Sequence, residues 1–308
     1  MRCRCAGFAK IGTVRVQIVA VHDLANGVGE SPLWDGDTVR WVDITGRTVH
    51  GLGPDGGLVS HAMPDFPCFI ALRRRGGAIV GLRRELAYLD LGSGELVHWM
   101  DVEPDRPDNR CNEGGVDPKG RLWFGTMQSN LDPSGAERPI TATTGALYRL
   151  DPDGACTRVL DDIGLSNTLA WSPDGVTMYF GDTLQNRIRR YRLDVDGGII
   201  STDDFHGRPP VGACDGSALD TEGYLWNARF GAGCLIRFAP DGSVDARIDL
   251  PVTNPTSCCF GGHDLRTLYV TSARFGLTEA ALGANPSEGA LVVLSTDVQG
   301  LPANRFAG

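Results

Sequence analysis

The sequence predicts an all-β protein, a six-bladed β-propeller whose blades are four-stranded antiparallel sheets. Three observations lead to this fold class. A polar turn followed by an apolar strand recurs along the 308 residues, a second series of turns alternates with it, and no long helical stretch competes with the two. Two hairpins in each unit of roughly 50 residues make a four-stranded sheet, and six such sheets are typical of a propeller.

The recurring unit is clearest where the turn Asp117 to Gly120 leads into an apolar strand that runs to Met127. Similar units lie at 34–41, 171–179 and 219–226, with weaker copies at 72–80 and 260–270. The second series of turns lies at 54–56, 92–94, 151–154, 194–197, 240–242 and 297–300. Each series therefore marks one hairpin per blade. We expect the aspartates of the first series, such as Asp117 and Asp220, to lie in exposed turns.

The two ends of the chain predict how the ring closes. Residues 1–13 are expected to form a loose N-terminal tail, and residues 14–308 a single six-bladed propeller domain. Val14 to Val21 has the composition of a strand, whereas Leu301 to Phe306, after the last turn, is a poor one. We therefore expect the N-terminal strand to supply the outer edge of the last blade and so close the ring.

The composition argues against several classes of protein. The net charge of -9 and the pI of about 5.1 have the wrong sign for a nucleic-acid-binding surface. Charged residues interrupt the apolar residues of the N-terminus, so neither a signal peptide nor a membrane span is predicted. Nine scattered cysteines without zinc spacing favour reduced thiols and a cytoplasmic protein. The Gly-x-Ser-x-Gly and His-Glu-x-x-His motifs are absent, so the local signs of a serine hydrolase or a His-ligated zinc enzyme are missing. We also expect the protein to be a monomer.

Aligning the units against one another predicts a polar site. Counting back five residues from the turns at positions 35, 117, 172 and 220 gives four oxygen-bearing residues: Glu30, Asn112, Asn167 and Asp215. Equal offsets place equivalent residues at one depth in different blades, so these side chains are expected to converge near one mouth of the channel. Carboxylate and amide oxygens suit a hard divalent cation. Taken singly, each residue also fits a local turn or capping role.

Four segments, in this order, resemble the signatures of a known family of six-bladed propellers, the gluconolactonase, regucalcin (senescence marker protein) and luciferin-regenerating enzyme family. The segments are Gly29 to Trp34, Arg110 to Met127, Gly164 to Gly175 and Asp215 to Trp226. The resemblance extends from about residue 16 to residue 300. Four ordered signatures are far more specific than any one of them alone.

The resemblance implies a site and an activity. Members of the family hydrolyse sugar lactones and contain calcium, zinc, manganese or iron in different cases. By resemblance, one divalent metal ion would be held by Glu30, Asn167 and Asp215. The substrate contacts implied in the same way are Arg110, Asn112 and Glu113.

Three residues depart from the family pattern. Glu113 stands where the family usually has an aspartate, and Thr168 stands where a glycine is common. Cys214 replaces the proline that the family has before the residue equivalent to Asp215. The side chain at position 113 is one methylene longer than usual, which would shift any hydrogen bond that it makes to a substrate. The identity of the lactone is therefore left open.

The chemistry of these residues suits ester hydrolysis. A divalent ion can polarise an ester carbonyl and acidify a coordinated water, while a nearby carboxylate accepts the proton of the attacking water. We expect Asp215 to be that base. The alternative is that a hydroxide bound to the metal attacks without a base. Arg110 would stabilise an oxyanion or bind a sugar hydroxyl, and Asn112 would bind ring substituents. The alternative for Arg110 is a solvated surface cation.

The function predicted from the sequence is metal-dependent hydrolysis of a sugar lactone (an aldonolactone) to the open-chain sugar acid. A metal-dependent phosphotriesterase or aryl esterase on the same site is one alternative. A non-enzymatic calcium-binding propeller is another, because propellers host unrelated functions.

Overall fold

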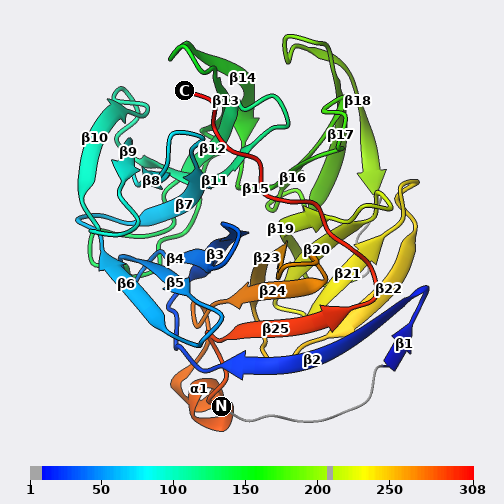
Figure 1. The fold of residues 1–308 in the computed structure, drawn as a ribbon. Coiled ribbons are helices and arrows are strands. Elements are labelled where there is room, and N and C mark those ends of the chain that lie inside the picture. The colour runs from blue at the N-terminus through cyan, green and yellow to red at the C-terminus, as the bar shows by residue number, and fades with distance from the viewer. Residues whose placement is uncertain (1–8, 207–210) are drawn as a thin grey trace.

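The strands form six sheets around a central channel in the computed structural model, which describes residues 9–206 and 211–308 (Figure 1). All pairs of neighbouring strands within these sheets are antiparallel. The protein is therefore a six-bladed β-propeller, and the predicted fold class is confirmed.

Each of the first five blades contains four consecutive strands, the first of which is innermost. Blade 1 contains β3 (Gly29–Trp34), β4 (Val39–Asp43), β5 (Thr48–Leu52) and β6 (Leu58–Ala62). Blade 2 contains β7 (Pro67–Leu72), β8 (Ala78–Leu82), β9 (Glu85–Leu89) and β10 (Leu96–Asp101). Blade 3 contains β11 (Asn109–Val116), β12 (Leu122–Gln128), β13 (Gly145–Leu150) and β14 (Cys156–Ile163). Blade 4 contains β15 (Ser166–Trp171), β16 (Thr177–Asp182), β17 (Arg187–Leu193) and β18 (Ile199–His206). Blade 5 contains β19 (Ala213–Leu219), β20 (Leu225–Phe230), β21 (Cys234–Phe238) and β22 (Val244–Asp249).

Blade 6 joins the two ends of the chain. Its inner strands are β23 (Pro255–Gly261), β24 (Thr267–Ser272) and β25 (Leu291–Thr296). The N-terminal strand β2 (Val14–His22) pairs antiparallel with β25, which confirms the predicted closure of the ring. Within the segment expected to be a tail, β1 (Ala9–Ile11) adds a fifth strand outside β2, and residues 1–8 lie outside the described residues.

Burial decreases from the channel outward. All six residues of β7 are buried, whereas β6 and β10, the outer strands of blades 1 and 2, contain no buried residue. Both faces of a blade pack against neighbouring blades near the channel, so the inner strands are continuously buried instead of alternating. Trp41, Trp123 and Trp226 are fully buried within these packed layers.

The turn aspartates Asp117 and Asp220 are buried, so the expectation that they lie exposed is wrong. One oxygen of each carboxylate accepts two backbone N–H groups of its own turn. The other oxygen of Asp117 accepts Trp123 Nε1 at 3.0 Å. The other oxygen of Asp220 accepts Trp226 Nε1 at 2.9 Å and Arg237 Nη2 at 2.7 Å. These donors replace water, which permits the burial of the charge.

Residues Leu301–Phe306, which we name the C-terminal strap, cross the channel on the face where the inner strands end (Figure 1). The backbone N–H groups of Leu301 and Phe306 bond to carbonyls of blades 5 and 2. Asn304 Nδ2 donates to the Val116 carbonyl of blade 3 at 3.0 Å, and Phe306 is fully buried. The segment that made a poor strand in the sequence therefore ties three blades together.

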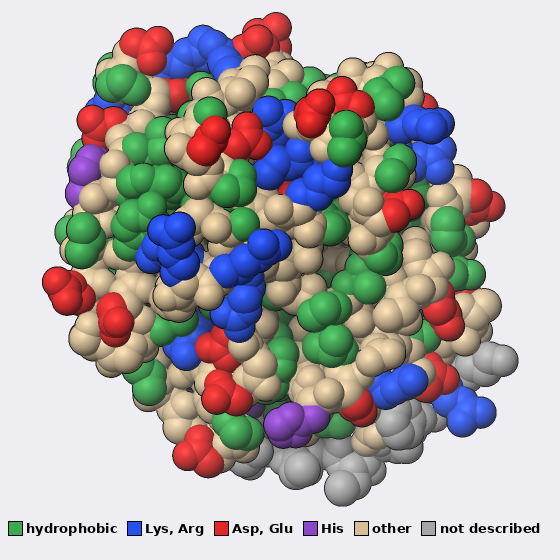
Figure 2. All heavy atoms as spheres, turned by 45° about the horizontal axis from the view of Figure 1, so that its top comes forward, with side chains coloured by type: hydrophobic (Ala, Val, Ile, Leu, Met, Phe, Trp, Pro, Cys, Tyr) green, Lys and Arg blue, Asp and Glu red, His purple; other side chains and the backbone are tan. Residues whose placement is uncertain are grey.

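Three further features concern the helix, the cysteines and the surface charge. α1 (Glu279–Ala284), in the β24–β25 connection, is the helix of the described residues, and no helix among them is long and apolar enough to cross a membrane. The seven cysteines of the described residues are free thiols. Basic and acidic side chains are interspersed on the face shown in Figure 2, without a continuous basic tract.

Candidate functional site

The four aligned residues lie on the innermost strands of four blades. Glu30 is on β3, Asn112 on β11, Asn167 on β15 and Asp215 on β19. Three of them are buried, and Asn112 is half-buried. All four precede the strand ends over which the C-terminal strap passes. The predicted site therefore lies toward the opposite mouth of the channel.

A β-bulge interrupts the pairing of every inner strand near this depth. The register shifts at 31–32, 112–113, 168 and 215–216 in the blades that carry the aligned residues, and at 68 and 256 in the other two. Ser31 and Thr168 adopt φ angles of +50° and +47° within these bulges. A bulge breaks the alternation of a strand and re-aims its side chains. Sequence periodicity does not reveal this feature.

Three carboxyl groups interact at this depth. The side chains of Glu30 and Asp215 interact with each other, and Glu30 accepts the Ser31 N–H at 2.6 Å. Burial raises the pKa of Glu30 to about 7, against the opposing effect of the Arg110 charge. Burial, with the negative charges of Glu30 and Glu113, raises the pKa of Asp215 well above its ordinary value. Burial and the charge of Glu30 likewise raise the pKa of Glu113.

Arg110 lies near these three carboxyl groups but forms no ion pair with any of them. Its Nη1 donates to Asn112 Oδ1 and to the Cys111 carbonyl, both at 2.7 Å, and its Nη2 donates to Asn130 Oδ1 at 2.8 Å. These acceptors are neutral, and no ion pair of Arg110 is present among the described residues. Arg110 is only 5% exposed, so the alternative of a solvated surface cation is wrong.

Asn112 and Asn167 connect blades 3 and 4. Asn112 Nδ2 lies 3.3 Å from Asn167 Oδ1. Asn167 Nδ2 donates to Thr183 Oγ1, whose hydroxyl donates to the Cys214 carbonyl, both at 2.7 Å. Within the described residues no hydrogen bond joins Asn167 directly to a carboxylate of the predicted metal site. The structure thus brings Glu30 and Asp215 into contact and links Asn167 to the residue before Asp215 through Thr183.

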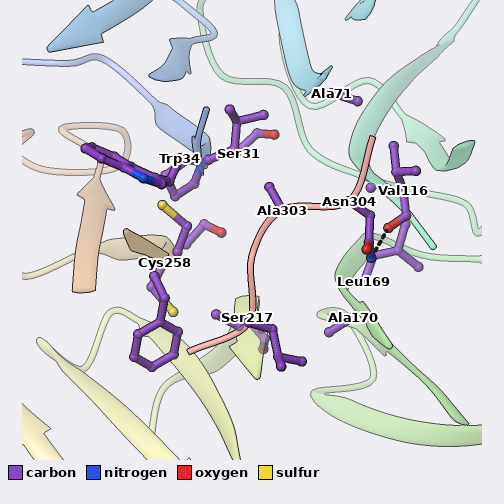
Figure 3. Close-up of a pocket in the computed structure, with 18 of the residues that line it drawn as sticks. Ser31, Trp34, Ala71, Val116, Leu169, Ala170, Ser217, Cys258, Ala303 and Asn304 are labelled. Carbon is purple, nitrogen blue, oxygen red and sulfur yellow. Dashed lines mark hydrogen bonds between the residues drawn. The ribbon is translucent and has the colours of Figure 1, made fainter. Parts of the chain in front are cut away.

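A cavity of about 180 Å³ continues the channel toward the C-terminal strap (Figure 3). The ends of all six inner strands line it, together with Ala303 and Asn304 of the strap. Glu113 lines this cavity and also interacts with the other two carboxyl groups, and it accepts the Gly114 N–H at 3.0 Å. Trp171 lines the cavity as well, and its buried Nε1 has no hydrogen-bond partner in the described residues. The cavity was not predicted, because its floor is the strap.

A separate group of possible cation ligands lies on the outer strands of blade 2. Glu85, His98 and Asp101 come from β9 and β10, and His98 Nδ1 pairs with Glu85 Oε2 at 2.9 Å. His98 and Asp101 are exposed and Glu85 is half-buried. None of the three belongs to an inner strand, so this group is distinct from the channel site.

The channel residues fit a hard divalent cation. Their donors are carboxylate and amide oxygens, which calcium and similar ions prefer. Burial raises the pKa values of Glu30, Glu113 and Asp215, and no cationic side chain of the described residues forms an ion pair with any of the three. A bound cation would stabilise their ionised forms. Glu30, Asn167 and Asp215 are therefore suitable ligands, and Glu113 interacts with the two carboxyl groups through its charge.

Comparison with known proteins identifies the family. A family model described as the SMP-30/Gluconolactonase/LRE-like region matches residues 28–274. The 6-deoxy-6-sulfogluconolactonase of Pseudomonas putida is 36% identical over 288 residues, which cover 91% of this chain and 95% of that protein. The L-arabinolactonase of Azospirillum brasilense is 35% identical over 298 residues, which cover 95% of this chain and 96% of that protein. The structure of the calcium-binding protein regucalcin from Agrobacterium tumefaciens has a TM-score of 0.86 and 32% identity, and the match covers 94% of this chain and 97% of that one. The chain therefore belongs to the SMP-30/gluconolactonase/LRE-like family.

Proposed function

We propose that this protein hydrolyses a sugar lactone to the open-chain sugar acid with the help of one divalent cation. The observation that carries the proposal is the buried contact of Glu30 with Asp215, with Glu113 and the unpaired Arg110 close by, toward one mouth of the channel. The two lactonases among the relatives support lactone hydrolysis. The calcium-binding regucalcin supports a cation in the site.

Glu30, Asn167 and Asp215 would hold the cation. When bound, a divalent cation supplies a Lewis acid for the lactone carbonyl and lowers the pKa of a nearby water. The C-terminal strap lies across the other end of the channel, so we place substrate entry at the mouth opposite the strap. Calcium, zinc, manganese and iron all remain candidates.

Asp215 would act as the general base. The water oxygen attacks the carbonyl carbon while Asp215 accepts the water proton. The bond between the carbonyl carbon and the ring oxygen then breaks, and the ring oxygen receives that proton to become a hydroxyl group. The products are the carboxyl and hydroxyl groups of one sugar acid.

Arg110, Asn112 and Glu113 would position the lactone. The guanidinium of Arg110 has only neutral acceptors, so its charge is available to the oxygen that becomes negative in the tetrahedral intermediate. Asn112 would bind a ring substituent. Glu113 lies closest to the cavity, and we propose that it contacts the substituent that reaches deepest into the channel.

One set of assays tests the proposal. Protein treated with a chelator is assayed with five- and six-membered aldonolactones, a phosphotriester and an aryl ester, before and after adding calcium, manganese or zinc. We expect lactone hydrolysis that disappears on metal removal and returns with a divalent ion. Lactone hydrolysis that persists without metal would contradict the cation. Faster phosphotriester or aryl ester hydrolysis would favour the alternative enzyme, and calcium binding without hydrolysis of any substrate would favour the non-enzymatic propeller.

A further inference from the structure

Thr168 has an unfavourable backbone conformation next to the channel site. It lies in the β15 bulge, directly after Asn167, and its φ is +47°. A β-branched residue is a conformational outlier in this left-handed region, whereas glycine adopts it without steric cost. Thr168 is also fully buried. Such strain persists only where surrounding contacts enforce it, and it clusters at functional sites.

The contacts of the Thr168 hydroxyl cross from blade 4 to blade 5. Thr168 Oγ1 donates to the carbonyl oxygen of Asp215. The same oxygen lies 3.0 Å from Ser217 Oγ and accepts Asn227 Nδ2 at 3.2 Å. Asn227 Nδ2 also lies 2.8 Å from the Asp215 carbonyl. The hydroxyl therefore joins the backbone that follows Asn167 to the backbone of Asp215 itself.

We propose that Thr168 is a positioning residue that sets the spacing between the oxygen donors of Asn167 and Asp215 for a divalent cation. This inference rests on the function proposed above. A glycine at this position would remove the strain, but it would also remove the only side chain of blade 4 that is hydrogen-bonded to the Asp215 carbonyl among the described residues. The threonine therefore costs local stability but fixes the spacing of the two ligands. Residues that contact metal ligands and orient them affect metal affinity in this way.

A second blade junction has a similar arrangement. Thr256, the bulge residue of β23 in blade 6, donates its hydroxyl to the carbonyl of Gly29, the residue before Glu30. Thr256 is buried and its hydroxyl also lies 2.9 Å from Thr271 Oγ1. Bulge hydroxyls therefore hold the backbone at both carboxylate ligands, from the preceding blade in each case.

Three substitutions separate the hydroxyl from the backbone strain. Thr168→Val keeps the shape and the strain but removes the hydroxyl, Thr168→Gly removes both, and Thr168→Ser keeps the hydroxyl. Calcium and manganese affinities are measured by titration calorimetry, and the melting temperature is measured in chelator. Thr126→Val is the matched control, because Thr126 is a fully buried threonine whose hydroxyl bonds to Glu103 and Ala146 and to none of the proposed cation ligands.

We expect the valine and glycine variants to bind the cation about tenfold more weakly than wild type. The cation affinity of the serine variant should stay within about threefold of the wild-type affinity, because serine keeps the hydroxyl. The glycine variant should melt in chelator no lower than the valine variant, and Thr126→Val should lose stability without losing affinity. Wild-type affinity in both the valine and the glycine variants, or an equal loss in the serine variant, would overturn the proposal. Failure of wild type itself to bind either ion would instead refute the cation site on which it rests.

Discussion

The side chains of Glu30 and Asp215 interact although they come from blades 1 and 5, which are not adjacent in the ring. Without a cation, two buried carboxyl groups that interact favour a state in which at least one of them holds a proton. Arg110 lies near enough to favour the ionised form of Glu30, but it forms no ion pair with it. A divalent cation in the site would take the place of this proton, so protons and metal should compete.

The first prediction concerns stability against pH in the absence of metal. Burial raises the pKa of Glu30 from 4.5 to about 7 in the folded protein. A raised carboxyl pKa favours the folded state while the group is neutral, so this contribution is fully present below about pH 4.5 and is lost as the pH rises through about 7. We expect the melting temperature in chelator to fall across this window, and excess calcium to reverse the fall.

Glu30→Gln provides the control for this measurement. The glutamine cannot titrate, so its melting temperature should depend less on pH over the same window. Some dependence should remain, because the pKa values of Asp215 and Glu113 are also raised. A fall as steep as that of wild type would show that Glu30 does not carry the effect.

The second prediction concerns the general base. Asp215→Ala should reduce lactone hydrolysis by about 10²–10⁴-fold, because it removes a proton acceptor and a ligand charge together. The assay is the initial rate at saturating lactone with calcium present. Asp241→Ala is the matched control, since Asp241 lies in an exposed turn where it accepts the Ser243 N–H at 2.9 Å. Full activity of Asp215→Ala with metal still bound would refute the assignment.

The sequence predicts the blades and their closure because each depends on local turns and strand composition, which repeat. It also places Glu30 and Asp215 at one depth, since equal offsets from a turn are preserved as long as the inner strands are alike. The bulges are not predictable in this way, because the left-handed Thr168 is held by a hydrogen bond to Asp215 of blade 5, far away in the sequence. The burial of Asp220 likewise depends on Arg237, which lies 17 residues farther along the chain.

The third prediction concerns Arg110. Arg110→Ala should reduce kcat by about 10²–10³-fold while the metal content stays unchanged, because its charge serves the developing oxyanion and not the cation. Arg110→Lys should recover only part of the rate, since lysine lacks the planar fork that reaches Asn112 and Asn130 together. Kinetics and metal analysis of the same preparations test this. Loss of the metal in Arg110→Ala would mean that Arg110 supports the ligands instead.

The fourth prediction follows from the burial of Asp220. Asp220 and Arg237 form an ion pair in which both side chains are fully buried. Removing one partner of such a pair leaves the other without compensation and costs about 3–5 kcal/mol. In Asp220→Ala, Arg237 would still form an ion pair with Asp245, which lies 2.8 Å away. We therefore expect the loss of stability to lie near the lower end of this range. Urea unfolding in chelator measures the loss, and the calcium affinity of the folded variant should be unchanged.

The last prediction compares two metal ligands of different charge. Glu30→Gln should weaken calcium binding more than Asn167→Ala, because the first removes a negative charge and the second a neutral oxygen. Each tenfold loss of affinity removes about 1.4 kcal/mol of the stabilisation that saturating calcium gives to the folded state. The calcium-induced rise in melting temperature should therefore shrink in both variants, and more in Glu30→Gln. Asp241→Ala, in its exposed turn, should keep the full rise. Wild-type calcium affinity in Glu30→Gln would mean that the ion does not lie between blades 1 and 5, and that the contact of Glu30 with Asp215 serves the fold alone.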